Sequence, residues 1–135
     1  MQTTERILRE MKTMAVVGLS RDPGKPAHSV PKAMRAAGFR VLPVNPIADE
    51  LLGERVYRTL AEIPEPVELV LVFRPAEEAV AVAHQAVAIK AKALWLQLGI
   101  ESDEARRIAQ AAGLLYVEDR CIGVERALHR VVKTV

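Results

Sequence analysis

The chain has a single cysteine, Cys121, among its 135 residues. One cysteine cannot form an internal disulfide, which agrees with a reducing compartment. Long apolar runs are also absent, since the longest, such as residues 69–73, are far shorter than the roughly 20 residues of a membrane-spanning helix. Residues 1–11 carry scattered charges and lack the apolar core of a secretory signal. We therefore expect a cytoplasmic protein that contains no membrane segment.

The sequence also lacks the glycine motifs of the common nucleotide-binding loops. The loop at residues 18–29 contains neither G-x-G-x-x-G nor G-x-x-x-x-G-K-[ST]. The second apolar run ends in VLPVNP, without the acidic residue that holds the ribose of NAD. Lys25 is not followed by Ser or Thr, and no acidic strand end is placed to hold magnesium. NAD binding and ATP hydrolysis are therefore both disfavoured.

The chain also lacks a large excess of charge of one sign, because its formal net charge is only +2. Lys and Arg are spread among Glu residues rather than gathered on one segment, which argues against a nucleic-acid partner. There is no internal repeat and no linker rich in Gly, Ser or Pro, so we expect residues 1–135 to form one domain. Asn45 is the only asparagine and Arg outnumbers Lys, a composition compatible with a thermophile.

Apolar runs alternate with segments of helical spacing along the whole chain. Buried strands are predicted over residues 13–18, 39–44, 67–73, 93–97 and 114–117. A short first helix carries Ile7, Leu8 and Met11, and further helices are predicted from 28 or 29 to 37 and over 75–90, 102–112 and 122–132. This alternation predicts right-handed crossovers and a Rossmann-like, doubly wound α/β fold. Its mainly parallel sheet has about five strands, with helices on both faces.

Several residues are placed to begin or end these helices. Thr3 or Thr4 is expected to cap the first helix, and Ser102 a later one. Pro31 and Pro75 suit first turns, where a missing N–H has no partner to lose. Gly38 and Gly113 suit left-handed helix ends. Residues 55–57 are expected to be extended, and Thr59 with Glu62 forms a possible capping box that opens one or two helical turns.

Ligands of such a sheet bind beyond the carboxyl ends of its strands. The first of these ends leads into the loop at residues 18–29, where Gly18 permits a tight turn and Ser20 and Ser29 offer hydroxyls. The helix that follows presents free N–H groups and a positive dipole end to an anion. Arg21, Lys25 and Arg74 add cations, so this loop favours a ligand that carries phosphate. The alternative is that these are solvated loop charges.

The remaining reactive side chains give weaker indications. His28 suits either a phosphate contact or a helix cap. Cys121 precedes a predicted helix and has His84 and His129 as possible bases for nucleophilic catalysis, against the alternative of a small buried residue. Three isolated histidines and one cysteine give no zinc-ligand spacing. Trp95, between two leucines of a buried strand, is expected in the core.

Five segments, all at strand ends, resemble a known family. They are VGLSRDPGKPAHSV, GFRVLPVNP, LVFRP, ALWLQLGI and DRC. In this order they resemble the small CoA-binding proteins, single Rossmann-like domains similar to the N-terminal CoA-binding domain of the succinyl-CoA synthetase alpha subunit. The resemblance covers nearly the whole chain.

The resemblance implies that coenzyme A (CoA) lies across the strand ends. Its phosphates are expected near Gly18, Ser20, Arg21, Lys25 and Ser29. Its adenine side is expected to meet Pro43, Asn45 and Pro46, while Phe73, Arg74 and Pro75 form another wall and Gln97 and Gly99 close the pocket.

The chain departs from this family at Arg126, which follows Glu125 where relatives tend to read Glu-His, so no role of that histidine transfers. The second alpha domain of the synthetase and its partner subunit are absent, and ligase activity is not expected. We expect a module that binds CoA or acyl-CoA without catalysis. The alternatives are acyl transfer with Cys121 as nucleophile and a regulatory subunit of a CoA-dependent complex. A homo-oligomer or an unidentified protein partner stays open.

Overall fold

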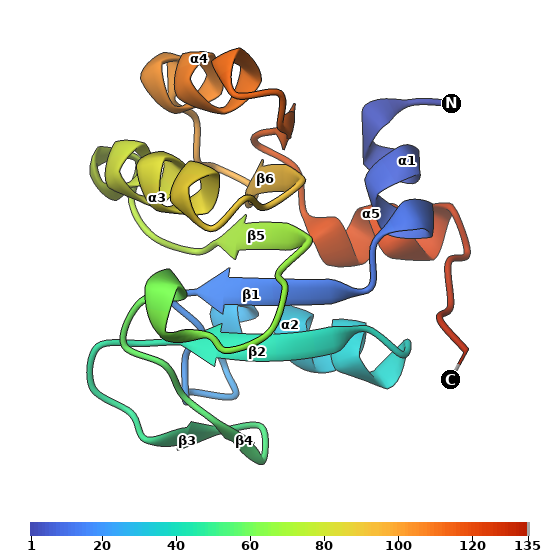
Figure 1. Cartoon of the computed structure of the whole chain (residues 1–135). Helices are drawn as coiled ribbons and strands as arrows, with labels where there is room; N and C mark the ends of the chain where they lie inside the picture. The colour runs from blue at the N-terminus through green and yellow to red at the C-terminus, as the bar shows by residue number, and fades with distance from the viewer. Residues whose placement is uncertain (135) are drawn as a thin grey trace.

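The computed structural model describes residues 1–134 and places a parallel sheet between two layers of helices (Figure 1). The helices are α1 (Thr3–Glu10), α2 (Pro26–Ala36), α3 (Ala76–Ala88), α4 (Asp103–Ala111) and α5 (Ile122–Leu128). The strands of the sheet are β1 (Thr13–Val17), β2 (Arg40–Val44), β5 (Leu69–Val72), β6 (Ala93–Leu96) and β7 (Leu115–Val117).

The strands lie in the order β2-β1-β5-β6-β7, and every neighbouring pair is parallel. The predicted Rossmann-like α/β fold with a sheet of about five strands is confirmed. The chain runs from β1 outward to β2 and then returns to β5 on the other side of β1. The order of the strands therefore reverses beside β1, and ligands of open α/β sheets bind outside the carboxyl ends at such a point.

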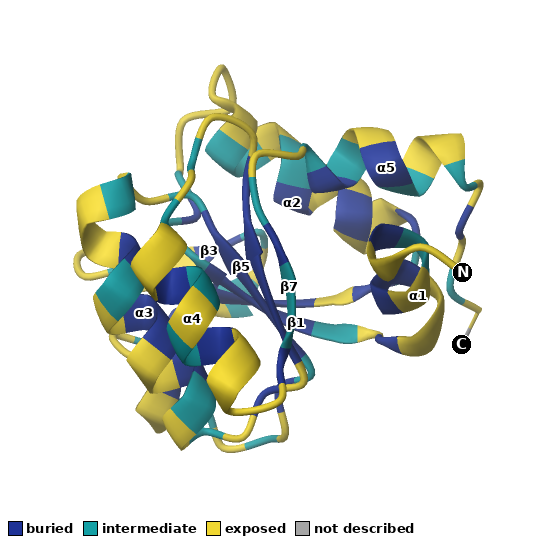
Figure 2. Cartoon of the chain, turned by 90° about the horizontal axis from the view of Figure 1, so that it is seen from above, coloured by how far each residue is buried: buried dark blue, intermediate teal, exposed yellow. Residues whose placement is uncertain are grey.

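Each face of the sheet is covered by helices, as the view from above shows (Figure 2). Helices α3 and α4 cover one face, and α1, α2 and α5 cover the other. Each face of the sheet has its own hydrophobic core, and successive residues of β1 point alternately into the two. Met14 and Val16 pack with α1 and α2, while Ala15 packs with α3 and α4. Trp95 is fully buried and its Nε1–H donates to the Arg120 carbonyl at 2.8 Å, which confirms its predicted place in the core.

Helix α2 begins earlier than predicted. It starts at Pro26, after an extended Lys25, so the start at residue 28 or 29 and the place of Pro31 in the first turn were wrong. Pro31 lies inside the helix instead, and its missing N–H leaves the Ala27 carbonyl without the usual helical donor. The N–H of Ser20 takes that place at 3.0 Å. The proline thus lets the helix bind the loop that precedes it.

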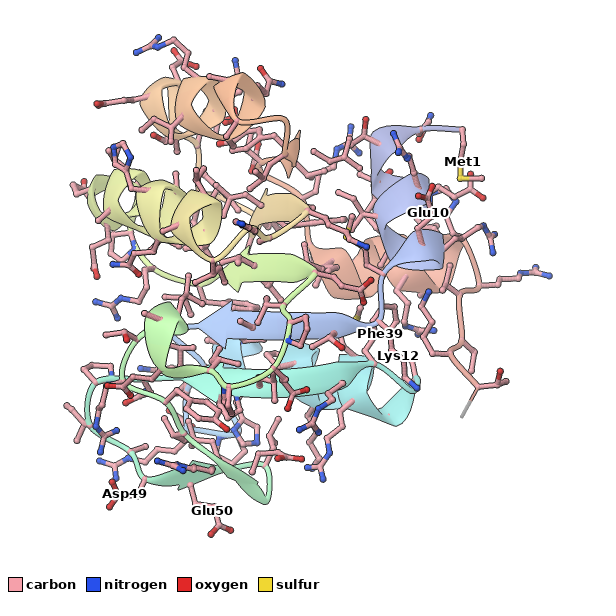
Figure 3. All side chains as sticks on the ribbon, in the orientation of Figure 1. Met1, Glu10, Lys12, Phe39, Asp49 and Glu50 are labelled. Atoms are coloured by element: carbon pink, nitrogen blue, oxygen red, sulfur yellow. The ribbon has the colours of Figure 1, made fainter. Side chains whose placement is uncertain are left out.

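The segment between β2 and β5 holds a small hairpin that was not predicted. Strands β3 (Glu50–Leu51) and β4 (Glu54–Arg55) pair antiparallel around Leu52 and Gly53, whose φ values are 53° and 72°. Two positive φ values at the central positions are typical of the tight turns that join such strands. The hairpin lies beside β2, and Asp49 and Glu50 mark it in Figure 3.

A single 3-10 turn, η1 (Leu60–Glu62), follows the hairpin where one or two helical turns were predicted. The predicted capping box does not form. Thr59 makes no side-chain cap, and the Glu62 carboxylate accepts from the Arg58 N–H at 3.0 Å instead of from Thr59. A turn this short offers too few unpaired N–H groups for a reciprocal pair of caps.

The predicted ends of the longer helices are confirmed in part. Gly38 and Gly113 have φ values of 96° and 85°, and the Ser102 hydroxyl accepts from the Ala105 N–H at 3.1 Å. Two predictions were wrong. The residue before α1 is Gln2 rather than Thr3 or Thr4, and α5 ends at Leu128 rather than near Val132, with a left-handed Arg130 (φ 54°) just beyond.

The other boundaries differ by only one or two residues. Helix α3 begins after Pro75 and ends at Ala88, with Lys90 left-handed at φ 60°. The extended piece expected at 55–57 is divided between β4 and a bridge from Tyr57 to Val44. Within residues 1–134, no helix combines the length and the apolar character that crossing a membrane requires.

Candidate functional site

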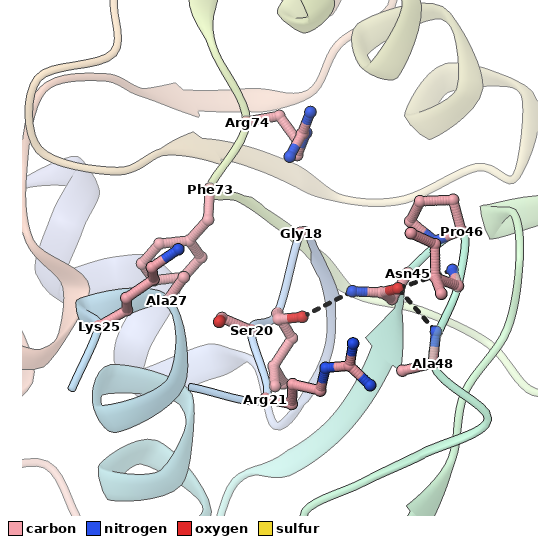
Figure 4. Close-up of a pocket in the computed structure, with 12 residues that line it drawn as sticks. Gly18, Ser20, Arg21, Lys25, Ala27, Asn45, Pro46, Ala48, Phe73 and Arg74 are labelled. Carbon is pink, nitrogen blue, oxygen red and sulfur yellow. Dashed lines mark hydrogen bonds between the residues drawn. The ribbon is translucent and has the colours of Figure 1, made fainter. Parts of the chain in front are cut away.

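A cavity of about 350 Å³ opens at the carboxyl edge of the sheet, where the strand order reverses (Figure 4). The loop after β1, the end of β2 and the end of β5 surround it. Eight of the residues predicted from the sequence line this cavity, and they are Gly18, Ser20, Arg21, Lys25, Asn45, Pro46, Phe73 and Arg74. The structure therefore brings together side chains from three strand ends that are up to 56 residues apart in sequence.

The loop after β1 is held in place by its own backbone. Gly18 has a φ of 91°, and its N–H donates to the Val44 carbonyl at 3.0 Å. Ser20 makes three hydrogen bonds. Its N–H donates to the Ala27 carbonyl, its hydroxyl oxygen accepts from the Asp22 N–H, and its carbonyl oxygen lies 2.6 Å from Nδ1 of His28. His28 thus holds the loop from the helix side and does not line the cavity.

Asn45 connects the two loops that form the floor of the cavity (Figure 4). Its amide nitrogen donates to the Leu19 carbonyl at 3.0 Å, and its amide oxygen accepts from the N–H groups of Ile47 and Ala48 at 2.8 and 3.0 Å. The amide oxygen is therefore committed to the loop after β2. Asn45 supports the shape of the site, and one of its two N–H donors is used in doing so.

The three cations of the cavity differ in their partners. Arg21 and Lys25 are exposed, and among residues 1–134 neither makes an ion pair or a side-chain hydrogen bond. Arg74 is bound to Glu78, in the first turn of α3, with Nε and Nη2 donating to the carboxylate at 3.2 and 2.8 Å. That hydrogen bonding raises the pKa of Arg74 above its ordinary value. Two positive side chains are thus free to bind an anion.

Gly18 is needed for a second reason besides its backbone angle. A Cβ atom at this position would lie 2.7 Å from Cδ of Arg74 and 3.3 Å from the Phe73 carbonyl oxygen. The aliphatic stem of Arg74 therefore lies directly against the Gly18 backbone. Any side chain here would displace Arg74 as well as strain the turn.

Ser29 and Pro43 lie outside this cavity. Ser29 is exposed and lines a shallower hollow on the outer side of α2, together with Pro23 and Lys32. Pro43 is buried within β2, where it pairs with Val16, and its carbonyl accepts from the Tyr57 N–H at 3.0 Å. The predicted contacts of these two residues with a ligand stay predictions.

Pro75, Gln97 and Gly99 also lie outside the cavity lining. Pro75 is the residue before α3. Gln97 is 5% exposed, and its side-chain oxygen accepts from the Ile122 N–H at 3.1 Å. Gly99 is exposed, and its N–H donates to the Asp119 carboxylate at 2.7 Å. Their predicted roles in the site therefore stay predictions too.

Four lining residues were missed by the sequence analysis, and they are Leu19, Ala27, Ile47 and Ala48. All four are aliphatic, and by residue type alone aliphatic side chains at strand ends carry no sequence signal that separates them from core residues. Ile47 is 75% exposed although it is a large apolar residue. Its place directly after Pro46 at the end of β2 is the sequence feature that would have identified it.

Neither His84 nor His129, the two histidines predicted as possible bases, is placed beside Cys121. Cys121 is the residue before α5, and His129 follows the other end of the same helix, about 12 Å away at 1.5 Å per residue. His84 is exposed on α3, across the sheet from α5 (Figure 2). Within residues 1–134, no three His, Cys, Asp or Glu side chains gather in a way that would hold a metal.

A family model described as a CoA binding domain matches residues 12–127, which include every strand of the sheet. The chain belongs to the CoA-binding domain family. This agrees with the resemblance seen in the five strand-end segments. The cavity described above lies at the carboxyl edge of this domain, the edge at which open α/β sheets generally bind their ligands.

Relatives of the chain are of two kinds. It is 39% identical to the uncharacterized protein YneT of Bacillus subtilis over 124 residues, 92% of each chain. A solved structure from Thermus thermophilus is 38% identical, has a TM-score of 0.89 and covers 96% of this chain and 99% of its own. An ADP-forming acetate–CoA ligase of Archaeoglobus fulgidus is 35% identical over 68 residues, 49% of this chain but only 10% of that enzyme.

Proposed function

We propose that the chain is a binding module for CoA or an acyl-CoA, and that the ligand occupies the cavity between the ends of β1, β2 and β5. The observation that carries this proposal is the pair of unpartnered cations, Arg21 and Lys25, on a loop whose backbone is fixed by other bonds. A fixed loop with free charges binds an anion without first having to be ordered.

The chemistry of CoA fits this cavity. CoA carries a diphosphate and a ribose phosphate, which are the groups that Arg and Lys side chains bind through charge-assisted hydrogen bonds. The amino end of α2 adds its positive dipole, since Lys25 and Ala27 both line the cavity. A volume of about 350 Å³ is within the range of small-molecule sites. Ile47, Ala48 and Phe73 offer apolar surface to a purine.

Isothermal titration with CoA, ADP and NAD tests the proposal. We expect saturable binding that is tightest for CoA, because CoA carries the most phosphate. The variant with Arg21→Ala and Lys25→Ala should lose about tenfold in affinity and show a shallower dependence on salt. The matched control is the variant with Lys90→Ala and Arg107→Ala, which removes two exposed cations outside the cavity. It should bind CoA as tightly as the wild type does. Absence of saturable heat with millimolar CoA contradicts the proposal.

A second function, acyl transfer with Cys121 as nucleophile, stays a prediction that a thiol titration tests. A nucleophilic cysteine reacts with an alkylating reagent in the folded protein and at a pH below that of a free thiol. A structural cysteine reacts at the ordinary rate or only after unfolding. The regulatory-subunit alternative is tested by purifying the protein from its native cell and identifying what is bound to it.

A further inference from the structure

Arg74 lies between two cavities rather than at the wall of one. The first is the cavity described above, and the second, of about 260 Å³, lies between residues 58–59, just before η1, and α3. Gly18, Asn45, Pro46 and Arg74 line both. The two hollows are therefore neighbours along the same carboxyl edge.

Arg74, a charged side chain that lines both cavities, is held by a contact that is easily exchanged. The stem of Arg74 lies on Gly18, and its guanidinium is bound to Glu78. Both side chains are about half exposed, at 46% and 48%, and they are four residues apart. Exposed ion pairs of this kind contribute little to stability, so a phosphate that approaches Arg74 competes with a weak partner.

The second cavity differs from the first in its chemistry. Its walls are largely aliphatic, from Val17, Val44 and Val82. The hydroxyl of Thr59, the amide of Gln85 and the Glu78 carboxylate, which is paired with Arg74, lie at its side. Its other cation, Arg58, is already bound to Asp49 at 2.6 Å and to the Asn45 carbonyl. Such a lining suits an uncharged chain of methylene and amide groups, and it offers no free charge to a phosphate.

Size gives a separate reason to join the two cavities. The first cavity, at about 350 Å³, is near the lower limit for sites that enclose drug-sized ligands. CoA combines a nucleotide with a long pantetheine arm and is larger than such ligands. A cavity of this volume holds one part of the molecule, and the remainder needs space beyond it.

We propose that the two cavities are chambers of one groove, that a ligand phosphate takes Arg74 from Glu78, and that the second chamber then receives the pantetheine arm. This inference rests on the proposed function. The nucleotide and its phosphates stay in the first chamber, where Arg21 and Lys25 are free. Glu78, at the wall of the second chamber, is thereby an affinity-determining residue whose effect on the phosphates acts through Arg74.

A double-mutant cycle tests the exchange of Arg74. Titrations with CoA compare the wild type, Glu78→Gln, Arg74→Ala and the double variant. We expect Glu78→Gln to tighten CoA binding about threefold, because it frees Arg74 from its internal partner. The control is Glu77→Gln, because Glu77 is an exposed neighbour that makes no bond to Arg74. When Arg74 is already replaced by Ala, Glu78→Gln should change CoA affinity no more than Glu77→Gln does.

Two results overturn the exchange. One is that Glu78→Gln and Glu77→Gln change CoA affinity equally. The other is that Glu78→Gln changes CoA affinity by the same factor with and without Arg74. Either outcome means that Glu78 affects CoA affinity only as a negative charge that repels the phosphates, and not by holding Arg74. If the wild type itself fails to bind CoA, the proposed function fails, and this outcome is distinct because it appears before any variant is compared.

Narrowing the second chamber tests its occupant. Ala81 is exposed on α3 and lines this chamber, so Ala81→Phe fills it without entering the core. The ligands are CoA and 3′-phospho-ADP, which is CoA without pantetheine. We expect Ala81→Phe to weaken CoA binding about tenfold and to leave 3′-phospho-ADP unaffected, since about 1.4 kcal/mol of lost arm contact corresponds to tenfold. The matched control, Ala88→Phe at an exposed position of α3 outside both cavities, should change neither affinity.

Each other outcome contradicts the assignment. Equal weakening of both ligands places the nucleotide, not the arm, in the second chamber. Unchanged binding of both ligands excludes this chamber from the groove. A thermal unfolding midpoint close to that of the wild type shows that Ala81→Phe remains folded during these titrations.

Discussion

The two ends of the carboxyl edge differ in what their polar groups bind. At the ends of β1, β2 and β5, Arg21 and Lys25 have no partner among residues 1–134. At the ends of β6 and β7, Gln97 is bound to the Ile122 N–H and Gly99 to the Asp119 carboxylate. One sheet edge thus has an open half, with charges free for a ligand, and a closed half, whose polar groups bind the protein itself.

The closed half is rich in acidic side chains, whereas the open half carries free positive charges. Arg106 and Arg120 lie there, but they are bound to Glu118 at 2.7 Å and to Glu125 at 3.1 Å. Glu101 lies close to Asp119, and the negative charge of Asp119 raises the pKa of Glu101 above its ordinary value. Position at a strand end is therefore insufficient to identify a binding residue. The partners that a side chain already has decide whether it is available.

The largest expected effect comes from Gly18→Ala in the open half. The substitution strains a positive φ and places a methyl group 2.7 Å from Arg74 Cδ. We expect the free energy of unfolding to fall by at least about 1 to 2 kcal/mol, and CoA affinity to fall at least about tenfold. Chemical denaturation and titration measure the two quantities.

Gly113→Ala is the matched control, because Gly113 has a similar φ of 85° and no atom within 4 Å of the added Cβ. It should lose about 1 to 2 kcal/mol of stability through backbone strain and keep its CoA affinity. If both variants lose affinity equally, the fit of Arg74 against Gly18 does not matter for binding.

Gln97→Leu tests whether the closed half is structural. The variant leaves the Ile122 N–H buried without a partner, which should lower the free energy of unfolding by about 1 to 3 kcal/mol. CoA affinity of the folded protein should be unchanged, and Gln110→Leu, at an exposed position, should change neither quantity. A stable Gln97→Leu protein that binds CoA much more weakly would assign Gln97 to the site and remove the difference between the halves.

The smallest expected effect is the pH dependence of Glu101→Gln. A raised carboxyl pKa in the folded state means that ionisation of Glu101 disfavours folding, so its contribution becomes less favourable as pH rises through that pKa. We expect the variant to have a slightly higher Tm than the wild type at pH 7. The difference should vanish below about pH 4, where the carboxyl is protonated in the folded and unfolded states alike. A constant Tm difference from pH 3 to 7 contradicts this account.

The fold follows closely from local sequence patterns. Runs such as LVLV in β5 and ALWL in β6 are apolar at every position, and only a strand covered on both faces buries them completely. The strand ends, and with them the edge that carries the site, follow from these runs. The start of α2 does not, because Pro26 and Pro31 both suit a first helical turn. The choice between them depends on the bond from Ser20 to Ala27, which is a tertiary contact.

Sequence alone distinguishes free from bound polar groups poorly for a similar reason. Cations on a glycine-containing loop tend to have few internal partners, and Arg21 and Lys25 both line the cavity, while their predicted contact with a ligand stays a prediction. Gln97 follows a buried strand in the same way, yet its partner is the N–H of Ile122, 25 residues later. Sequence position alone cannot separate a polar group that awaits a ligand from one that already has a partner.

Pro31 has a consequence for how fast a ligand binds. By leaving the Ala27 carbonyl to Ser20, it joins the loop after β1 to the first turn of α2 by a hydrogen bond, and we expect the two to form one rigid unit. Ordering of the loop is then completed when the protein folds and does not slow the encounter with a ligand. Association should therefore show a single kinetic phase whose rate rises in proportion to ligand concentration, with no saturation from a slow loop rearrangement.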